Sequence, residues 1–130
     1  KRINRKLFSI TANTTVLRSE FFVYNATSTK EIIGFDFKEV TTIEIQGKCL
    51  KIHTINRGVI NTHIPIASME AITDGKGIFF KVHRSFIIST NFIESIQGDI
   101  IKMRYYKGEV KIGTTYREKF YEFLNSRLIR

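Results

Sequence analysis

One stretch of the sequence decides how the chain folds: Phe80-Lys81-Val82-His83-Arg84-Ser85-Phe86-Ile87-Ile88-Ser89. Successive side chains of a continuous strand point to opposite faces, so the even-numbered apolar side chains would share one face with Arg84 in its middle. An unpaired guanidinium is rarely buried, because removing its charge from water is costly. Either the strand bends near His83-Arg84-Ser85 and releases Arg84 to solvent, or a buried carboxylate pairs with Arg84.

A bend would give Arg84 a functional role. A cation held at a rigid bend is well placed to grip a phosphate or to read the edge of a base. The acids nearest in sequence, Glu94 and Asp99, lie beyond the next expected strand. We therefore expect an exposed Arg84 rather than a buried ion pair.

Short extended segments dominate both sides of this stretch. Alternation of apolar and other side chains predicts strands over residues 33–37, 41–45, 50–52, 60–64, 101–105 and 110–112. Turns are expected at Gln46-Gly47-Lys48, at Asn56-Arg57-Gly58 and, closing a hairpin, at Tyr106-Lys107-Gly108-Glu109.

Two helices interrupt the strands. The first is expected from Ile66 to Thr73, because Pro65 pre-sets the backbone of a first helical turn. The second starts near Thr115, which has capping-box spacing to Glu118. Its apolar stripe indicates core packing and comprises Phe120, Phe123, Leu124 and Leu128. The sequence thus predicts a mostly β domain of antiparallel strands with a short middle helix and a C-terminal helix.

The chain is basic and rich in large apolar side chains. Its 130 residues suffice for one domain with a core, and a hydrophobic content of 42% with eleven Phe excludes a disordered chain. Lys and Arg number 21 against 12 Asp and Glu, a formal charge of +9. This excess favours a polyanionic partner, either nucleic acid or an anionic membrane surface. A basic domain whose charge has no such role stays an alternative.

Residue patterns that enzymes and metal sites need are missing. Cys49 is the sole cysteine, which excludes an internal disulfide and a multi-thiolate zinc site. Cys49 and His53 would point to the same face of a strand about 13 Å apart, too far to share a ligand or a proton. Gly75-Lys76-Gly77 lacks the spacing of a phosphate-binding loop. We expect no catalysis, no metal and no cofactor.

The ends of the chain and its setting can also be interpreted. Residues 1–6 are basic without an acid, so residues 1–18 are expected to form a linker or N-terminal arm ahead of a domain over residues 19–130. No apolar run has the length of a membrane span and no signal peptide is visible, which favours the cytoplasm. Because the chain starts without Met, we expect it to be part of a longer protein.

Basic and hydroxyl side chains gather at several expected turns. Lys48 and Lys51 flank the Gly47 turn, and Arg84 sits at the expected bend. The entry to the last helix carries a larger set, comprising Lys111, Thr114, Thr115, Tyr116, Arg117 and Lys119. Most charged loops are simply exposed to solvent and bind nothing. Several of them on one domain, with backbone amides at a helix start, favour a surface that follows phosphates.

The same segments, in this order, resemble the LytTR-type DNA-binding domain of bacterial transcription regulators. Residues 80–88, followed by Ile93 and Ile96, are similar to that family's signature of Phe, a variable residue, Val-His-Arg-Ser, an aromatic residue and two aliphatic residues. Further similarities lie upstream, over residues 37–54, and downstream, over residues 107–116. In all, the resemblance covers about residues 19–124.

The resemblance implies an elongated, mostly antiparallel β-fold in which loops, rather than a recognition helix, enter successive major grooves. Mapped onto this chain, the family's contact positions are Lys48, Cys49, Lys51, Arg84, Thr114, Thr115, Tyr116 and Arg117. Lys111 joins them as an expected phosphate contact. The chain departs from the family at Ser89, where Asn is common, and at Thr114-Thr115, where Ser-Arg is common. It also departs at Cys49, where an aromatic residue or His often stands.

The leading hypothesis is a sequence-specific, double-stranded DNA-binding output domain of a bacterial transcription regulator of a two-component system. Promoter repeats would be its target, a homodimer on DNA is one arrangement, and a receiver or sensor domain would lie upstream. The alternative is a non-enzymatic interaction module of similar β-fold that binds a protein or an anionic membrane surface. A small hydrolase has the least support, because no catalytic constellation is visible.

Overall fold

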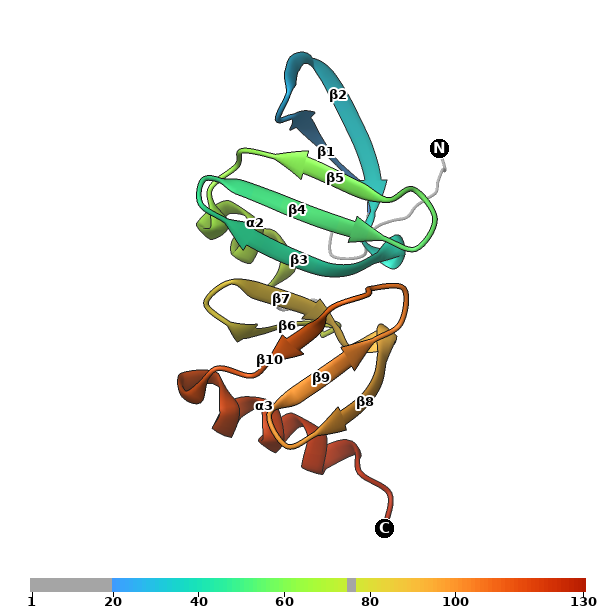
Figure 1. The fold of residues 1–130 in the computed structure, drawn as a ribbon, viewed down its shortest axis with the longest axis vertical. Helices are drawn as coiled ribbons and strands as arrows, with labels where there is room; N and C mark the ends of the chain where they lie inside the picture. Colours follow the sequence, from blue (N-terminus) through green and yellow to red (C-terminus); the bar gives the residue numbers. More distant parts are fainter. Residues whose placement is uncertain (1–19, 75–76) are drawn as a thin grey trace, which may run out of the picture.

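The fold is mostly β and elongated (Figure 1). The computed structural model describes residues 20–74 and 77–130, so the expected linker over residues 1–18 lies outside the described residues. In chain order, the elements are β1 (Glu20–Asn25), β2 (Ser28–Asp36), the 3-10 helix η2 (Phe37–Glu39), β3 (Val40–Gln46), β4 (Cys49–Thr54), β5 (Val59–Thr62), α2 (Ile66–Thr73), β6 (Phe79–His83), β7 (Phe86–Ser89), the 3-10 helix η3 (Thr90–Phe92), β8 (Ile93–Gln97), β9 (Ile100–Met103), β10 (Glu109–Lys111) and α3 (Thr114–Arg127). The expected class, including the middle and C-terminal helices, is confirmed.

Within the described residues, the strands form three sheets in which all neighbours are antiparallel. β1 and β2 pair with each other, the central sheet has the order β5-β4-β3-β7-β6, and the third sheet has the order β10-β9-β8. The β1–β2 hairpin lies at one end of the molecule, and the third sheet with α3 lies at the other (Figure 1). In the part of the chain that the structure describes, no helix has the length and apolar character to cross a membrane.

In the part of the chain that the structure describes, two hydrophobic cores hold these sheets together. The first core includes the buried side chains Val23, Phe35, Phe37, Val40, Ile43, Leu50, Ile52, Ile60, Met69 and Ile87. The second core includes the buried side chains Val82, Ile88, Ile101, Met103, Val110, Ile112 and Phe120. Because side chains alternate along a strand, β7 places Ile87 in the first core and Ile88 in the second. The central sheet is therefore covered on both faces.

Residues 80–89 fold back on themselves instead of forming one bent strand. β6 and β7 pair as a hairpin, and the turn consists of Arg84 and Ser85. Phe80 lies opposite Ile88, so both side chains point to the same face of the sheet. The expected sharing of one apolar face is confirmed, because the even-numbered apolar side chains all pack into or against the second core. The turn leaves Arg84 exposed.

The hairpin between β9 and β10 differs from its prediction. β9 ends at Met103, and the connection spans residues 104–108 instead of beginning at Tyr106. Tyr105 was expected to continue the strand, but its φ of 64° is left-handed and its side chain is 66% exposed. A non-glycine residue with positive φ cannot continue a β-strand, which is why the alternation fails here.

The start of α3 lies within one residue of its prediction, but its capping differs. The helix begins at Thr114 with Gly113 as its N-cap, and no side chain caps it, so the capping box of Thr115 and Glu118 is wrong. A long-range contact fixes the start, because the Gly113 N–H donates to the Val82 carbonyl of β6 at 2.7 Å. The end differs too: Leu128 follows the last helical residue and is 57% exposed, so it does not belong to the apolar stripe.

Candidate nucleic-acid interface

The predicted contact loops lie along one edge of the molecule. The β3–β4 turn, the β6–β7 turn and the β10–α3 connection all lie on the left side of Figure 1. Strand direction explains this arrangement. β3 is hydrogen-bonded to β4 and to β7, both antiparallel to it, so the end of β3 lies beside the starts of β4 and β7.

Backbone hydrogen bonds fix these turns relative to one another. The Ile45 N–H near the end of β3 donates to the Ser85 carbonyl in the β6–β7 turn at 2.8 Å. Gly113 at the start of α3 donates to Val82 at the end of β6 at 2.7 Å. A Cβ at position 113 would lie 3.1 Å from the Tyr116 ring and 3.5 Å from the His83 ring, so a glycine permits this close approach. The edge is thus a connected surface.

Arg84 stands at the centre of this edge on a turn that is itself held by a side chain. The Ser85 N–H donates to Nδ1 of His83 at 3.0 Å, which requires that this nitrogen carry no proton. The His83 ring also packs edge-on against Phe86, with ring centroids 5.9 Å apart. The sequence treated His83 only as part of the motif. A side chain that accepts a bond from the backbone two residues on is the local signal that identifies its role.

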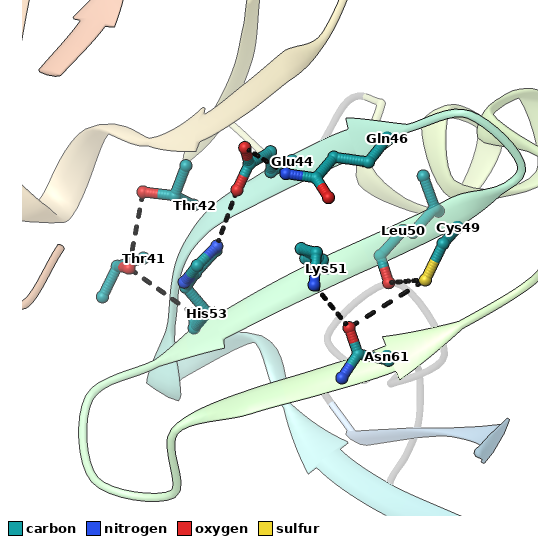
Figure 2. Close-up of polar contacts among 9 residues, drawn as sticks. All are labelled: Thr41, Thr42, Glu44, Gln46, Cys49, Leu50, Lys51, His53 and Asn61. Carbon is teal, nitrogen blue, oxygen red and sulfur yellow. Dashed lines mark hydrogen bonds and ion pairs between the residues drawn. The ribbon is translucent and has the colours of Figure 1, made fainter. Parts of the chain in front are cut away.

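The β3–β4 turn presents Lys48 but not Lys51. Lys48 is exposed beside Gly47, whose φ of 60° suits a glycine. Cys49 begins β4, is half-buried and has a free thiol. Lys51 lies further along β4 and donates from Nζ to Asn61 Oδ1 at 3.3 Å (Figure 2). Lys48 is therefore the cation of this turn, and Lys51 belongs to the polar face of the sheet.

The first turn of α3 brings the remaining predicted residues to the edge. Thr114, Thr115 and Arg117 are exposed, and Tyr116 is half-buried. The Arg117 guanidinium lies 5.4 Å from the Tyr121 ring centroid, so part of this side chain packs along the helix. Lys111 is exposed on β10, an edge strand of the third sheet. The helix start adds partial positive charge from its backbone amides.

Lys81 is a cation near this edge that the sequence did not single out. Its Nζ lies 2.8 Å from Glu70 Oε2 of α2 and 5.8 Å from the Tyr116 ring centroid. The hydrogen bond to Glu70 raises the pKa of Lys81 above its ordinary value. Because Glu70 balances this charge, Lys81 connects α2, β6 and α3 and offers little free charge to a ligand.

The polar face of the central sheet pairs His53 with Glu44 and Cys49 with Asn61. His53 lies 3.1 Å from Glu44, and Cys49 contacts Asn61 (Figure 2). The His53 ring also packs against Tyr106, with ring centroids 4.7 Å apart. Burial raises the pKa of Tyr106, and the nearby Glu44 carboxylate raises it further. Among the residues that the structure describes, no group of three or more His, Cys, Asp or Glu side chains could hold a metal ion.

The model of the LytTr DNA-binding domain family matches residues 30–125 of this chain. The chain belongs to the LytTr DNA-binding domain family. Its fold is similar to the solved LytTr DNA-binding domain of a putative methyl-accepting/DNA response regulator from Bacillus cereus, with a TM-score of 0.68 at 20% identity. That comparison covers 82% of this chain and 97% of the other. No curated protein matches the sequence.

The family signature, residues 80–88, spans the β6–β7 hairpin. The Val-His-Arg-Ser part of the signature supplies the end of β6, the ring that accepts the Ser85 bond, and the exposed cation. The individual contact residues of this LytTr domain stay predictions. The structure adds that Lys48, Arg84, Thr114 and Thr115 are exposed at its edge, whereas Lys51 is engaged by Asn61.

Proposed function

We propose that this LytTr domain binds double-stranded DNA sequence-specifically, as the output domain of a bacterial two-component transcription regulator. The observation that carries the proposal is the single edge on which exposed residues of the β3–β4 turn, the β6–β7 turn and the α3 start gather. Residues 19–130 would form the DNA-binding domain, in the cytoplasm, with residues 1–18 linking it to an upstream receiver or sensor domain. Promoter repeats would be the target.

Each part of the edge has a role that suits its chemistry. Arg84 is presented on a turn fixed by His83 and can donate two bonds to a guanine in the major groove. Lys48 and Lys111 offer flexible ammonium groups to phosphates, which position the protein without reading sequence. Thr114 and Thr115 offer hydroxyls at the start of α3, and phosphate oxygens bind well at helix starts.

The remaining predicted residues have supporting roles in this proposal. Tyr116 packs against Lys81, and Arg117 reaches the backbone of the DNA from the outer side of α3. Cys49 lies against the DNA only if the β3–β4 turn enters a groove, with Lys51 holding Asn61 behind it. We assign the direct contacts of this turn to Lys48 first.

A selection from a pool of random duplexes tests the function and identifies the target sequence in one experiment. We expect the chain to enrich one sequence motif, and to bind the selected duplex at least about a thousandfold more tightly than a shuffled duplex. Binding to anionic vesicles in the same buffer measures the alternative function. Enrichment of no motif, together with vesicle binding, would reject the proposal in favour of an interaction module.

A further inference from the structure

The turn that presents Arg84 is held at Ser85 by two hydrogen bonds. The Ser85 N–H donates to Nδ1 of His83 at 3.0 Å, and the Ser85 carbonyl accepts from the Ile45 N–H of β3 at 2.8 Å. Of these two bonds, the first alone involves a side chain that can gain a proton. A change of pH can therefore act on the turn through His83.

The bond between His83 and Ser85 exists only while the imidazole ring is neutral. A backbone N–H always donates, so Nδ1 must accept, and Nε2 carries the proton of the neutral ring. In a protonated ring both nitrogens are donors, and Nδ1–H would point at the Ser85 N–H. Rotation of the ring by half a turn would bring a carbon to the Ser85 amide instead. A charged ring therefore loses this bond in either orientation.

The His83 ring has little room to move away from the turn. It packs edge-on against Phe86 of β7, with ring centroids 5.9 Å apart. The start of α3 also lies against it, because a Cβ at position 113 would be 3.5 Å from Cδ2 of His83. Gly113 is itself bound to the Val82 carbonyl at 2.7 Å. A protonated ring thus stays beside the Ser85 N–H and presents a donor to a donor.

Protonation of His83 brings no ion pair in exchange for the lost bond. The titratable groups on the elements around the ring are Lys81 and Arg84 on the β6–β7 hairpin, Tyr116 on α3, and Tyr106 and Glu44, which lie next to Phe86. Glu44 lies 3.1 Å from His53, and Glu70 lies 2.8 Å from Lys81. Among the described residues, His83 itself is in no ion pair. The neutral ring therefore has a partner that the charged ring lacks.

We propose that neutral His83 is a positioning residue for Arg84, and that protonation of its ring lowers the sequence discrimination of DNA binding. This inference rests on the proposed function and adds a regulation to it. Histidine ordinarily changes charge between about pH 5 and about pH 8, so the Ser85 bond is present above this range and is lost as the pH falls through it. The Ile45 bond remains, so the domain stays folded and the placement of Arg84 changes.

The ratio of the affinities for the selected and the shuffled duplex, measured between about pH 5.5 and about pH 8, tests this inference. A ratio is needed because protons on His53 and His63 add charge and tighten binding to every duplex. In the wild type we expect the ratio to fall at least about fivefold toward acidic pH, the lower limit for loss of a two-bond base contact. A ratio that is constant with pH overturns the proposal.

Two substitutions of His83 separate the lost bond from a general disturbance of the turn. His83→Phe keeps an aromatic ring without an acceptor, so its ratio should be low at every pH while the melting temperature is unchanged. His83→Asn supplies an amide oxygen that accepts from the N–H two residues on and does not titrate, so it should restore the ratio and remove its pH dependence.

His63→Asn is the matched control for these variants. His63 is an exposed histidine outside the β6–β7 hairpin, so the variant should keep the wild-type pH profile. A His83→Asn protein whose ratio still falls with pH like the wild type overturns the proposal. If His83→Phe melts at a lower temperature, the profile of His83→Asn decides alone.

Nuclear magnetic resonance of the chain without DNA distinguishes a failure of this inference from a failure of the proposed function. We expect the nitrogen shifts of neutral His83 to place its proton on Nε2, and the Ser85 amide to shift as His83 titrates. A Ser85 amide that does not respond overturns the inference even if the chain selects a motif. If the chain selects no motif, the proposed function fails and the claim about discrimination fails with it. A responsive Ser85 amide then shows that the bond to His83 was assigned correctly.

Discussion

At the scale of single residues, Arg84 shows how a turn places a charged side chain in solvent within an otherwise apolar stretch. The side chain follows His83, whose ring accepts the Ser85 N–H, and so the guanidinium starts from a backbone that is already fixed. The planar guanidinium presents its donors in a rigid fork, so less entropy is lost for each hydrogen bond to a base, which suits Arg84 to discrimination more than to general affinity. Lys48 and Lys111 lack such a rigid group, because each carries its ammonium on a flexible four-carbon chain.

Arg84→Ala should therefore fold normally and lose specificity. Because no buried partner is stranded, we expect an unchanged melting temperature and a loss of about 1–3 kcal/mol of discrimination at one position of the selected duplex. Binding titrations with single-base variants of that duplex measure the loss. Arg127→Ala is the control, because it removes the same charge at the far end of α3, about 20 Å along the helix. A collapsed melting temperature with retained affinity would show that Arg84 is structural.

Ser89 is a second residue whose environment can be tested. Its side chain is 1% exposed, and its hydroxyl lacks a hydrogen-bond partner among the described residues. A buried hydroxyl without a partner costs stability, so Ser89→Ala should raise the free energy of unfolding by about 1 kcal/mol. Urea denaturation gives this value directly. A lower free energy would mean that the hydroxyl has a partner, such as an ordered water.

The sequence predicted local features well and long-range ones poorly. It placed α2 at Ile66–Thr73 and left Arg84 in solvent, since a proline and a lone cation in an apolar pattern act locally. It did not distinguish a bend from the β6–β7 hairpin, because both place Phe80 and Ile88 on one face. It placed the start of α3 within one residue, but it could not foresee how that start is held, because the bond from Gly113 to Val82 joins segments far apart in the chain.

At the scale of elements, α2 and β6 are joined by the ion pair of Glu70 and Lys81. Glu70→Gln should lower the free energy of unfolding at neutral pH by less than about 1 kcal/mol, because both side chains are partly exposed. The contribution is fully present below pH 10.5, the unfolded value for Lys81, and disappears as the pH rises through the raised folded pKa. Denaturation of both proteins at neutral and strongly alkaline pH measures the difference. A difference that persists at alkaline pH would rule out the charge as its cause.

At the scale of the whole molecule, the spread of basic residues along one edge predicts steep salt dependence. Each neutralised phosphate steepens the log–log plot of affinity against salt by about 0.9, so the wild-type slope should be several times that value. Lys111→Ala should weaken binding to specific and shuffled duplexes equally and reduce the slope by about 0.9. Titrations over a series of salt concentrations check both statements. Loss confined to the specific duplex would instead make Lys111 a base contact.

The division into two cores has a consequence for how the molecule opens. The cores meet at β7, where Ile87 and Ile88 face opposite ways, so each core and its strands form a candidate unit of cooperative opening. Met69→Ala should lower amide protection in β3, β4 and β5 by about 2–5 kcal/mol and leave β9 and β10 protected, as hydrogen exchange would show. A uniform drop would indicate one unit.

If the units open separately, the proposed DNA-binding edge includes residues from both units. The β3–β4 turn would belong to one half, the α3 start to the other, and the β6–β7 turn would stand on the boundary between them. We then expect the domain to leave DNA in steps, with the contacts of one unit breaking first. Arg84, which lies on the boundary, would release its contact last.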